Sequence, residues 1–258
     1  MRHDSVLKTV VVATLLCIIC SIFVSYAAVS LRPLQEKNKV LETKRNILVS
    51  AGLMEEGKSI EELFKKIEIK MVDISTGRFL EGMDVTKFSA KKALKDPKTS
   101  VKISDSKDIA KIKKRALHSL VYLVEKDNQL ETIILPIYGK GLWSTMYAFI
   151  ALKKDGNTVQ GLSFYEHAET PGLGGEVDNP NWKKLWKGKK IYDENWKFAI
   201  TLPKIKVDPS KPGAIHQVDG LSGATLTARG VENLIHYWMG DDGFAPFLTW
   251  IRSQGDEA

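Results

Sequence analysis

The sequence predicts an α+β protein in which one N-terminal transmembrane helix precedes a domain with an antiparallel sheet and flanking helices. Three observations support this fold class. The run from Thr9 to Leu31 has no charged side chain. Further along, two pairs of strand-like runs are each separated by a short polar turn. Near the C-terminus, apolar residues recur with the i, i+3, i+4, i+7 spacing of a helix face, at Val231, Leu234, Ile235 and Trp238.

The uncharged N-terminal run predicts a retained membrane anchor, because its length suffices to cross a hydrocarbon core of ~30 Å. A cleaved signal peptide is the alternative interpretation, with Ser25-Tyr26-Ala27 as a poor cleavage site. The apolar run continues past that site to Leu31, which favours the anchor. We therefore expect an anchor over residues 1–32, a helical stalk over 33–50 and an extracytoplasmic domain over 51–258.

The domain should begin with local elements that have clear sequence signals. Ala51-Gly52 marks the end of the stalk, and Ser59 to Glu62 resembles a capping box at the start of a helix. A strand is predicted at residues 69–74, and the lysine-rich residues 85–115 are predicted to form a surface excursion with one short helix. Two hairpins follow, the second around an Asp-Gly turn; their strands are residues 121–124 with 131–135, and 146–152 with 158–163.

Composition narrows the possible functions. The net charge is +7, yet the lysines are scattered, and their cluster between Trp182 and Trp196 is more typical of a solvated face over part-buried tryptophans than of a nucleic-acid site. Cys17 and Cys20 both lie in the apolar run, so the domain has no disulfide. Because no Gly-x-Gly-x-x-Gly follows a strand, no dinucleotide-binding unit is predicted. The sequence indicates neither a nucleic-acid partner nor a metal, since the acids around His167 match no zinc spacing.

The chain around Asp219 to Thr227 is rich in glycine and hydroxyl residues and directly precedes the C-terminal helix. Ser222 or Thr225 is positioned to cap that helix, since hydroxyl oxygens accept backbone N–H bonds of the first turn. Free N–H groups and the helix dipole favour an anion there, and Gly223 lets a ligand approach the backbone. An ordinary loop and cap is the alternative interpretation.

A second glycine-rich segment runs from His167 to Gly175 and contains Pro171. Such a loop has few side chains and a restricted backbone, so a flat ring can approach its amides. A plain turn is the alternative interpretation of this segment by itself.

Three blocks of the sequence resemble one family. Asp219-Gly-Leu-Ser-Gly-Ala-Thr225 resembles the acceptor motif for covalent flavinylation, in which a flavin transferase moves FMN from FAD onto the last threonine. Glu169-Thr-Pro-Gly-Leu-Gly174 and the Gly-x-Gly-Leu-Trp turn ending at Trp143 resemble segments of the FMN-carrying NqrC subunit of the Na+-translocating NADH:quinone reductase. The equivalent subunit of the related Rnf complex shares this FMN-binding domain.

The resemblance implies roles for particular residues. Thr225 would carry FMN through a phosphoester bond, Asp219 and Ala224 complete the acceptor motif, and Ser222 and Gly223 would border the phosphate. Near the flavin ring or ribityl chain we expect three residues of the second segment, with Trp143 as a packing residue: Thr170, Leu173 and Gly174.

The resemblance also implies a function: an electron-transfer subunit of a Na+-pumping NADH:ubiquinone reductase, bound to other subunits and anchored by one helix in the bacterial inner membrane. An Rnf-type subunit and a non-redox anchored binding module are the alternatives. Charge alone would put the domain in the cytoplasm, because more Lys and Arg follow the anchor than precede it. The flavin transferase acts outside the cytoplasm, so the resemblance implies a periplasmic domain.

Overall fold

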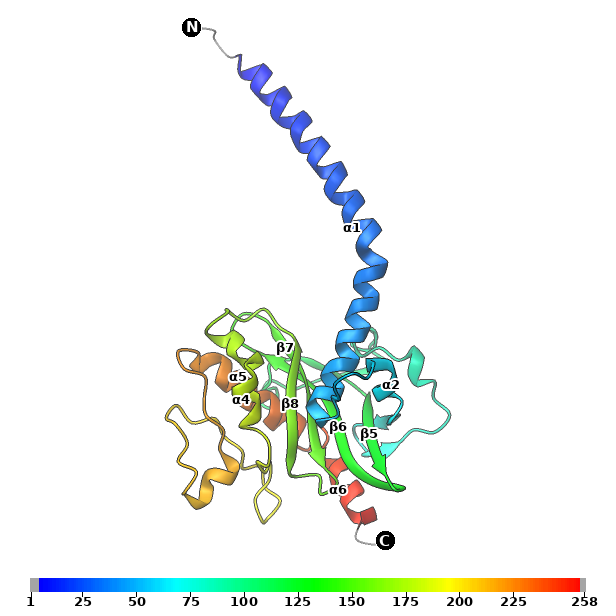
Figure 1. Ribbon diagram of the computed structural model, residues 1–258, viewed down its shortest axis with the longest axis vertical. Helices are drawn as coiled ribbons and strands as arrows, with labels where there is room; N and C mark the ends of the chain where they lie inside the picture. Colours follow the sequence, from blue (N-terminus) through cyan, green and yellow to red (C-terminus); the bar gives the residue numbers. More distant parts are fainter. Residues whose placement is uncertain (1–4, 256–258) are drawn as a thin grey trace. The chain divides into compact units, whose positions relative to one another are not determined.

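The computed structural model describes residues 5–255, which fall into two units, Met1–Thr43 and Lys44–Ala258 (Figure 1). A single helix, α1 (Val6–Ala51), runs from the first unit into the second. Its apolar part has a mean hydropathy of 2.5, so α1 is long and apolar enough to cross a membrane. The anchor and the stalk that the sequence predicts as separate regions thus lie on one continuous helix, which passes through Pro33.

The last turns of α1 belong to the domain. Ile47, Leu48 and Ala51 are buried, whereas the residues of α1 before Thr43 are largely exposed. The helix ends at Gly52, whose positive φ of 69° lets the N–H of Leu53 bond back to the carbonyl of Leu48. The predicted end of the helix at Ala51-Gly52 is therefore confirmed.

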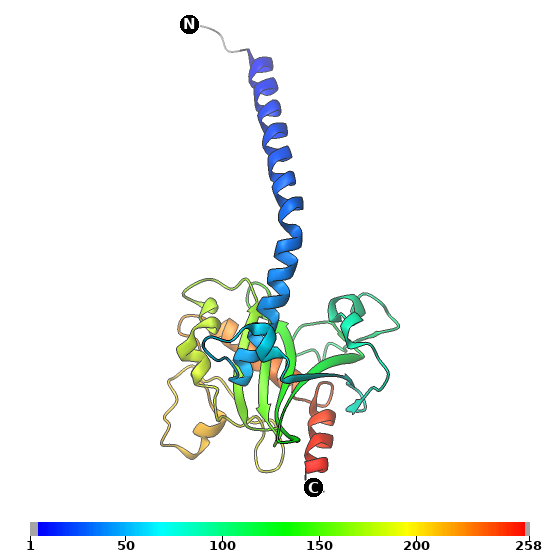
Figure 2. The same ribbon diagram turned by 45° about the vertical axis from the view of Figure 1, so that its right-hand side comes forward.

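The centre of the domain is a six-stranded antiparallel sheet in the order β2-β1-β5-β6-β7-β8. In the first hairpin, Asp127 and Asn128 have φ of 52° and 59°, the left-handed pair that a two-residue turn requires. Both predicted hairpins are present, with longer strands than the sequence predicts (Figure 2). The strands are β1 (Ile67–Asp73), β2 (Arg78–Phe79), β5 (His118–Lys126), β6 (Gln129–Lys140), β7 (Thr145–Lys153) and β8 (Val159–Glu166).

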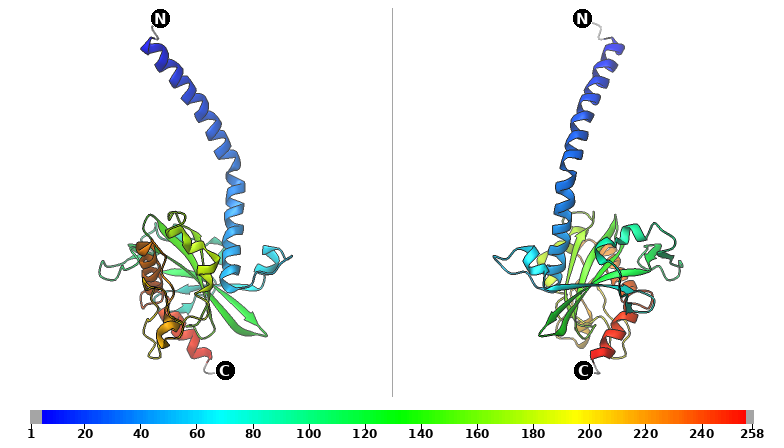
Figure 3. Two further views of the ribbon diagram at one scale, coloured as in Figure 1. Left: turned by 60° about the vertical axis from the view of Figure 1, so that its left-hand side comes forward. Right: turned by 90° about the vertical axis from the view of Figure 1, so that its right-hand side faces the viewer.

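Helices cover both faces of this sheet (Figure 3). Alternation along β6 directs Ile133 and Leu135 to one core, which contains α5 (Thr225–Trp238) and α6 (Ala245–Gly255). Ile134 points to the other core, formed with the end of α1 and with α2 (Ile60–Phe64). The α+β fold class is confirmed. Ser59 caps α2 as predicted, with its hydroxyl accepting the N–H of Glu62.

Residues 85–115 are more structured than the predicted surface excursion. They contain the predicted short helix, α3 (Ala90–Ala93), after the 3-10 turn η1 (Val85–Lys87). They also contribute a two-stranded sheet of β3 (Ser100–Lys102) and β4 (Lys114–Ala116). Ile103 and Ala110, between these strands, are buried in the core beside α5. The lysine content hid these few apolar anchors. Between β8 and α5 lie η2 (Gly174–Asp178), α4 (Pro180–Lys184) and η3 (Pro212–His216).

Candidate functional site

The first predicted motif lies at the N-terminus of α5. Gly223 turns the chain with φ of 70°, Ala224 occupies the cap position and Thr225 is the first helical residue. No side chain caps this helix, so the prediction that Ser222 or Thr225 does so is wrong. The reason is positional, because Ser222 lies before the turn and Thr225 lies inside the helix. The N–H groups of the first turn therefore stay available to an anion.

The hydroxyls of Ser222 and Thr225 face solvent. Both residues are exposed, and within residues 5–255 neither hydroxyl has a hydrogen-bond partner. Ala224, between them, is buried at 6% exposure and holds the turn against the core. The loop thus presents two unused hydroxyls on an anchored backbone.

The second predicted motif adjoins the first. A Cβ atom on Gly223 would lie 3.1 Å from the Leu173 side chain, and one on Gly174 would lie 2.5 Å from the Thr227 hydroxyl oxygen. The Thr170 carbonyl closes this loop by accepting the N–H groups of Leu173 and Gly175 at 3.1 and 2.8 Å. Hence the structure brings the two motifs together, and Gly174 has no room for a side chain.

The third segment is the turn between β6 and β7. A Cβ atom on Gly141 would lie 2.5 Å from a Glu169 carboxylate oxygen, and one on Gly230 of α5 would lie 2.6 Å from the Lys140 carbonyl oxygen. The turn therefore packs closely against both the second motif and α5. Trp143, expected as a packing residue, is instead 67% exposed, because the tight turn directs its side chain outward.

Glu169 joins all three segments. Its side chain, 5% exposed, accepts the backbone N–H groups of Leu142, Trp143 and Ser144 at 3.2, 3.0 and 3.2 Å. It also accepts the Thr227 hydroxyl at 2.7 Å. From the residues alone, Glu169 was considered only as one of the acids beside His167 and as part of the flavin motif. The one signal of its joining role is the pair of glycines at 141 and 174, which leave space for the carboxylate.

The carboxylate of Glu169 is held in its charged form. Burial raises the pKa of this group, but the hydrogen bonds from the Thr227 hydroxyl and the three backbone amides outweigh burial. The pKa therefore lies below its ordinary value of 4.5. The Ser144 hydroxyl is a fifth donor, at 3.5 Å, so this buried anion holds the three segments rigidly together.

Asp219, the first residue of the acceptor motif, has a structural contact of its own. Its carboxylate accepts the N–H of Val207 at 2.7 Å, and its backbone carbonyl accepts the indole N–H of Trp182 at 2.8 Å. Trp182 and Trp186 are buried at 7% and 0% exposure, so these two tryptophans of the lysine-rich cluster serve the core. Asp219 thereby fixes the loop that leads into the turn at Gly223.

Exposed apolar side chains lie on the segments that meet here. They come from the turn between β6 and β7, from the second motif and from the first turn of α5: Leu142 at 42%, Trp143 at 67%, Leu173 at 45% and Leu226 at 55% exposure. Together with the glycine-lined loops and the uncapped helix, these residues fit a phosphate linked to a flat apolar ring. FMN has this chemistry.

No metal site accompanies this arrangement in the part of the chain that the structure describes, where no cluster of three or more metal-ligating side chains occurs. His167 instead pairs with Asp178 at 2.7 Å, and Glu169 is occupied by its hydrogen bonds.

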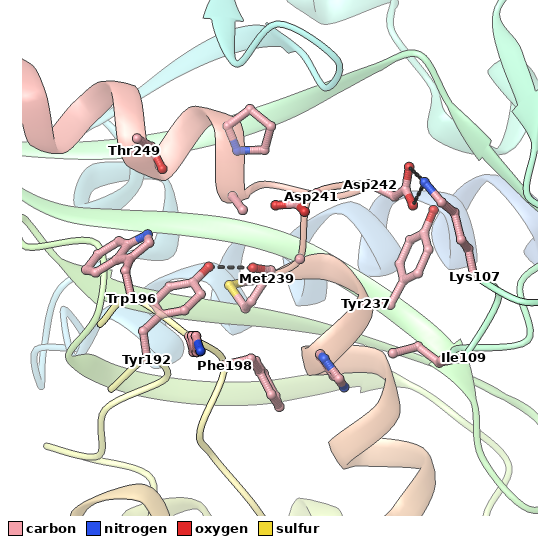
Figure 4. A pocket seen from close by; sticks show the side chains of 15 residues that line it. Lys107, Ile109, Tyr192, Trp196, Phe198, Tyr237, Met239, Asp241, Asp242 and Thr249 are labelled. Atoms are coloured by element: carbon pink, nitrogen blue, oxygen red, sulfur yellow. Dashed lines mark hydrogen bonds and ion pairs between the residues drawn. The ribbon is translucent and has the colours of Figure 1, made fainter. Parts of the chain in front are cut away.

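A hollow of about 570 Å³ lies at the opposite end of α5 and contains none of the predicted site residues (Figure 4). Two stacked pairs line it, Tyr192 with Trp196 and Phe198 with His236, at centroid distances of 4.5 and 4.1 Å. Since α5 is about 21 Å long at 1.5 Å per residue, this hollow is separate from the exposed hydroxyls.

The fold and the converging loops define a flavin-binding domain. Comparison with known families agrees, because residues 141–240 match the FMN-binding domain family. This range contains the turn at Trp143, the second motif and Thr225.

The chain is similar along nearly its whole length to the NqrC subunits of Na+-translocating NADH-quinone reductases. The relative from Pseudomonas aeruginosa strain PAO1 is 50% identical over 97% of this chain and 98% of its own. The relative from Vibrio vulnificus strain YJ016 is 48% identical over 98% of both chains. The crystal structure of NqrC from Shewanella oneidensis has a TM-score of 0.77 and 38% identity, covering 84% of this chain and 99% of that one.

The chain therefore belongs to the NqrC family of Na+-translocating NADH-quinone reductase subunits. It is an FMN-binding electron-transfer subunit of a multi-subunit oxidoreductase, and the other subunits of that complex are its partners. The predicted family and fold are confirmed.

Proposed function

We propose that Thr225 carries FMN covalently through a phosphoester bond. The observation that carries this proposal is the exposed Thr225 hydroxyl, which is unpaired within the described chain at the uncapped N-terminus of α5. A phosphodiester there keeps one negative charge, which the helix end stabilises by about 0.3–1 kcal/mol. So small an energy does not retain a cofactor against dilution, and the covalent bond does.

The attachment step transfers an FMN unit from FAD. The Thr225 oxygen bonds to the phosphorus of the FMN half, the pyrophosphate bond breaks, AMP leaves and the hydroxyl proton goes to solvent or to the transferase. Ser222 and Gly223 border the phosphate, while Asp219 and Ala224 hold the loop in place. A flavin transferase recognises the exposed residues of this loop, Ser222, Gly223 and Thr225.

The ring then lies against the second motif, with Thr170, Leu173 and Gly174 beside the ring or the ribityl chain. Leu173 supports this placement because it is exposed and lies directly beside Gly223. Bound flavin supplies exchange between two-electron and one-electron carriers. The residues of this chain would hold the ring beside this segment and leave it accessible to electron partners.

We further propose that α1 anchors the subunit in the bacterial inner membrane through lipid contacts, with the domain over residues 51–258 on the periplasmic side. The hydropathy of α1 supports the anchor, and the need for an extracytoplasmic transferase supports the orientation. Protease added to intact spheroplasts should digest the domain. Protection until the membrane is lysed would place it in the cytoplasm. The names of the relatives favour the Na+-pumping reductase over an Rnf-type complex.

The test is Thr225→Val in cells that contain the transferase. We expect the intact mass to lose one FMN unit, quinone reductase activity to vanish and the domain to fold with an unchanged melting temperature, since the hydroxyl makes no internal bond. Thr249→Val is the matched control, because Thr249 is also an exposed helical threonine but lies in α6. Flavin fluorescence on a denaturing gel of Thr225→Val would overturn the proposal.

A further inference from the structure

We propose that Glu169 is the positioning residue of the flavin site: its carboxylate fixes the turn at Leu142–Ser144 and the rotation of α5, and so determines where Thr225 and the ring meet. This inference rests on the proposed flavin attachment at Thr225. It follows from the five hydrogen bonds that end on one buried side chain and from the lack of space around them.

The hydrogen bond from Thr227 fixes the rotation of α5. Successive helical residues are turned by about 100°, so residues two apart point to nearly opposite sides. Thr227, 1% exposed, points inward and donates to Glu169 at 2.7 Å. Thr225 therefore points outward. If the helix turned to break the inner bond, the Thr225 hydroxyl would move relative to the loop of the second motif.

The three backbone bonds fix the turn that carries Trp143. Because the N–H groups of Leu142, Trp143 and Ser144 point inward to one carboxylate, the backbone of the turn is held in one conformation. The apolar side chains of Leu142 and Trp143 consequently stay exposed. The Ser144 hydroxyl reinforces this by accepting the N–H of Ala168 at 2.8 Å.

The space around the Glu169 carboxylate is filled by the neighbouring backbone. Cβ atoms on Gly141 or Gly174 would lie 2.5 and 3.0 Å from the Glu169 carboxylate oxygens. All donors to this carboxylate are neutral, three backbone amides and the hydroxyls of Thr227 and Ser144, so within the described residues no cation neutralises it. A fixed negative charge beside Thr170 opposes the addition of electrons to an adjacent ring. The charge therefore lowers the reduction potential of a flavin placed there.

Two pairs of variants of the full-length, flavin-loaded protein test the inference. Glu169→Gln removes the charge and replaces an acceptor with an amide donor, while Glu176→Gln makes the same change in the same loop, where the carboxylate accepts from the Asn179 side chain. Thr227→Val removes the hydroxyl bond to Glu169, while Thr227→Ser retains it. Covalent flavin content by intact mass, midpoint potential by spectroelectrochemical titration and melting temperature are measured for each.

We expect Glu169→Gln to shift the potential to more positive values and to lower flavin content several-fold, with Glu176→Gln matching the wild type in both. Thr227→Val should lower flavin content several-fold and Thr227→Ser should restore it. A purely structural role would lower the melting temperature without moving the potential of the flavin that remains.

The inference is overturned if Glu169→Gln and Glu176→Gln give the same potential, or if Thr227→Val keeps the wild-type flavin content. Should Glu169→Gln fail to fold, the flavin content and potential of the two Thr227 variants decide the question. A wild-type protein without covalent flavin would instead refute the proposed attachment, so the two failures are distinguishable.

Discussion

The two ends of α5 differ in what their residues leave free. At the N-terminal end, Ser222 and Thr225 expose hydroxyls, unpaired within the described residues, beside glycine-rich loops. At the C-terminal end there is a hollow of about 570 Å³, but its groups mostly contact one another. The Tyr192 hydroxyl donates to the Met239 carbonyl at 2.5 Å, and Lys107 pairs with Asp242 at 3.0 Å (Figure 4).

This difference shows that the size of a hollow does not decide whether its polar groups are free to bind or react. The hollow is lined by stacked aromatic pairs that stabilise the fold. Two buried polar atoms along it, the Trp196 indole nitrogen and the Tyr237 hydroxyl, lack protein partners in the described chain, and we expect ordered water there. The motif end offers a nucleophile and a helix dipole, and the proposed flavin site lies there.

The largest loss of stability should come from replacing one glycine by alanine at each end of α5. Gly174→Ala would place a Cβ 2.5 Å from the Thr227 hydroxyl oxygen, and Gly243→Ala would press one against the Trp238 carbonyl oxygen. Each should destabilise the domain by about 1–3 kcal/mol through overpacking. Only Gly174→Ala should also lose covalent flavin, as measured by intact mass beside a urea unfolding curve. Equal flavin loss in both variants would remove the distinction between the ends.

A smaller effect is expected from Tyr192→Phe at the hollow. This change leaves the Met239 carbonyl, in a residue with 0% exposure, without its hydrogen bond from the tyrosine. The free energy of unfolding should fall by about 1–2 kcal/mol, while flavin content and potential stay unchanged. Thermal unfolding and flavin absorbance check this. A shifted flavin potential would show that the two ends are coupled through α5.

The smallest expected effect is a loss of folding stability in acid. It should occur in a different pH range at each end of α5. The folded pKa of His236 is lowered from 6.5 by burial, so stability is lost as pH falls through the range below 6.5. At Glu169 the hydrogen bonds outweigh burial and lower the folded pKa from 4.5, so its contribution is lost as pH falls below 4.5.

Melting temperatures between about pH 8 and pH 3 give the measurement, with His236→Gln and Glu169→Gln beside the wild type. Each variant should flatten the curve only in the window of its own group. A flattening by both variants in the same window would contradict the assignment of these two pKa shifts to opposite ends.

Sequence reasoning recovered the elements whose signals are local. The Asp127-Asn128 turn and the periodic spacing of Val231 to Trp238 each depend on neighbours along the chain, and both predicted the structure correctly. The cap at Ser222 was wrong, because hydroxyl residues before a helix do not reveal where the turn at Gly223 starts it. The short sheet within residues 85–115 was missed because its apolar anchors are few and stand among lysines: Ile103 and Ala110 are buried, and Ile109 and Ile112 are partly buried.

The flavin motifs were predicted by resemblance, whereas the sequence did not predict that Glu169 links three segments of the site. Its donors lie in two other segments of the chain, Leu142–Ser144 and Thr227. No pattern around position 169 shows which amides converge on it, because convergence depends on the packing of α5 against β6. Only the tight contacts at Gly141 and Gly174 explain why these glycines occur there.

The exposure of the Thr225 side chain also bears on whether flavin attachment precedes or follows folding. An aliphatic hydroxyl is a weak nucleophile without an adjacent base, and within residues 5–255 no side chain takes that place. The proposed attachment would thus depend on an outside catalyst, which can act after folding is finished because Thr225 is already at the surface. In a host that lacks this catalyst, we expect a colourless, folded protein that accepts flavin when the catalyst and FAD are added in vitro.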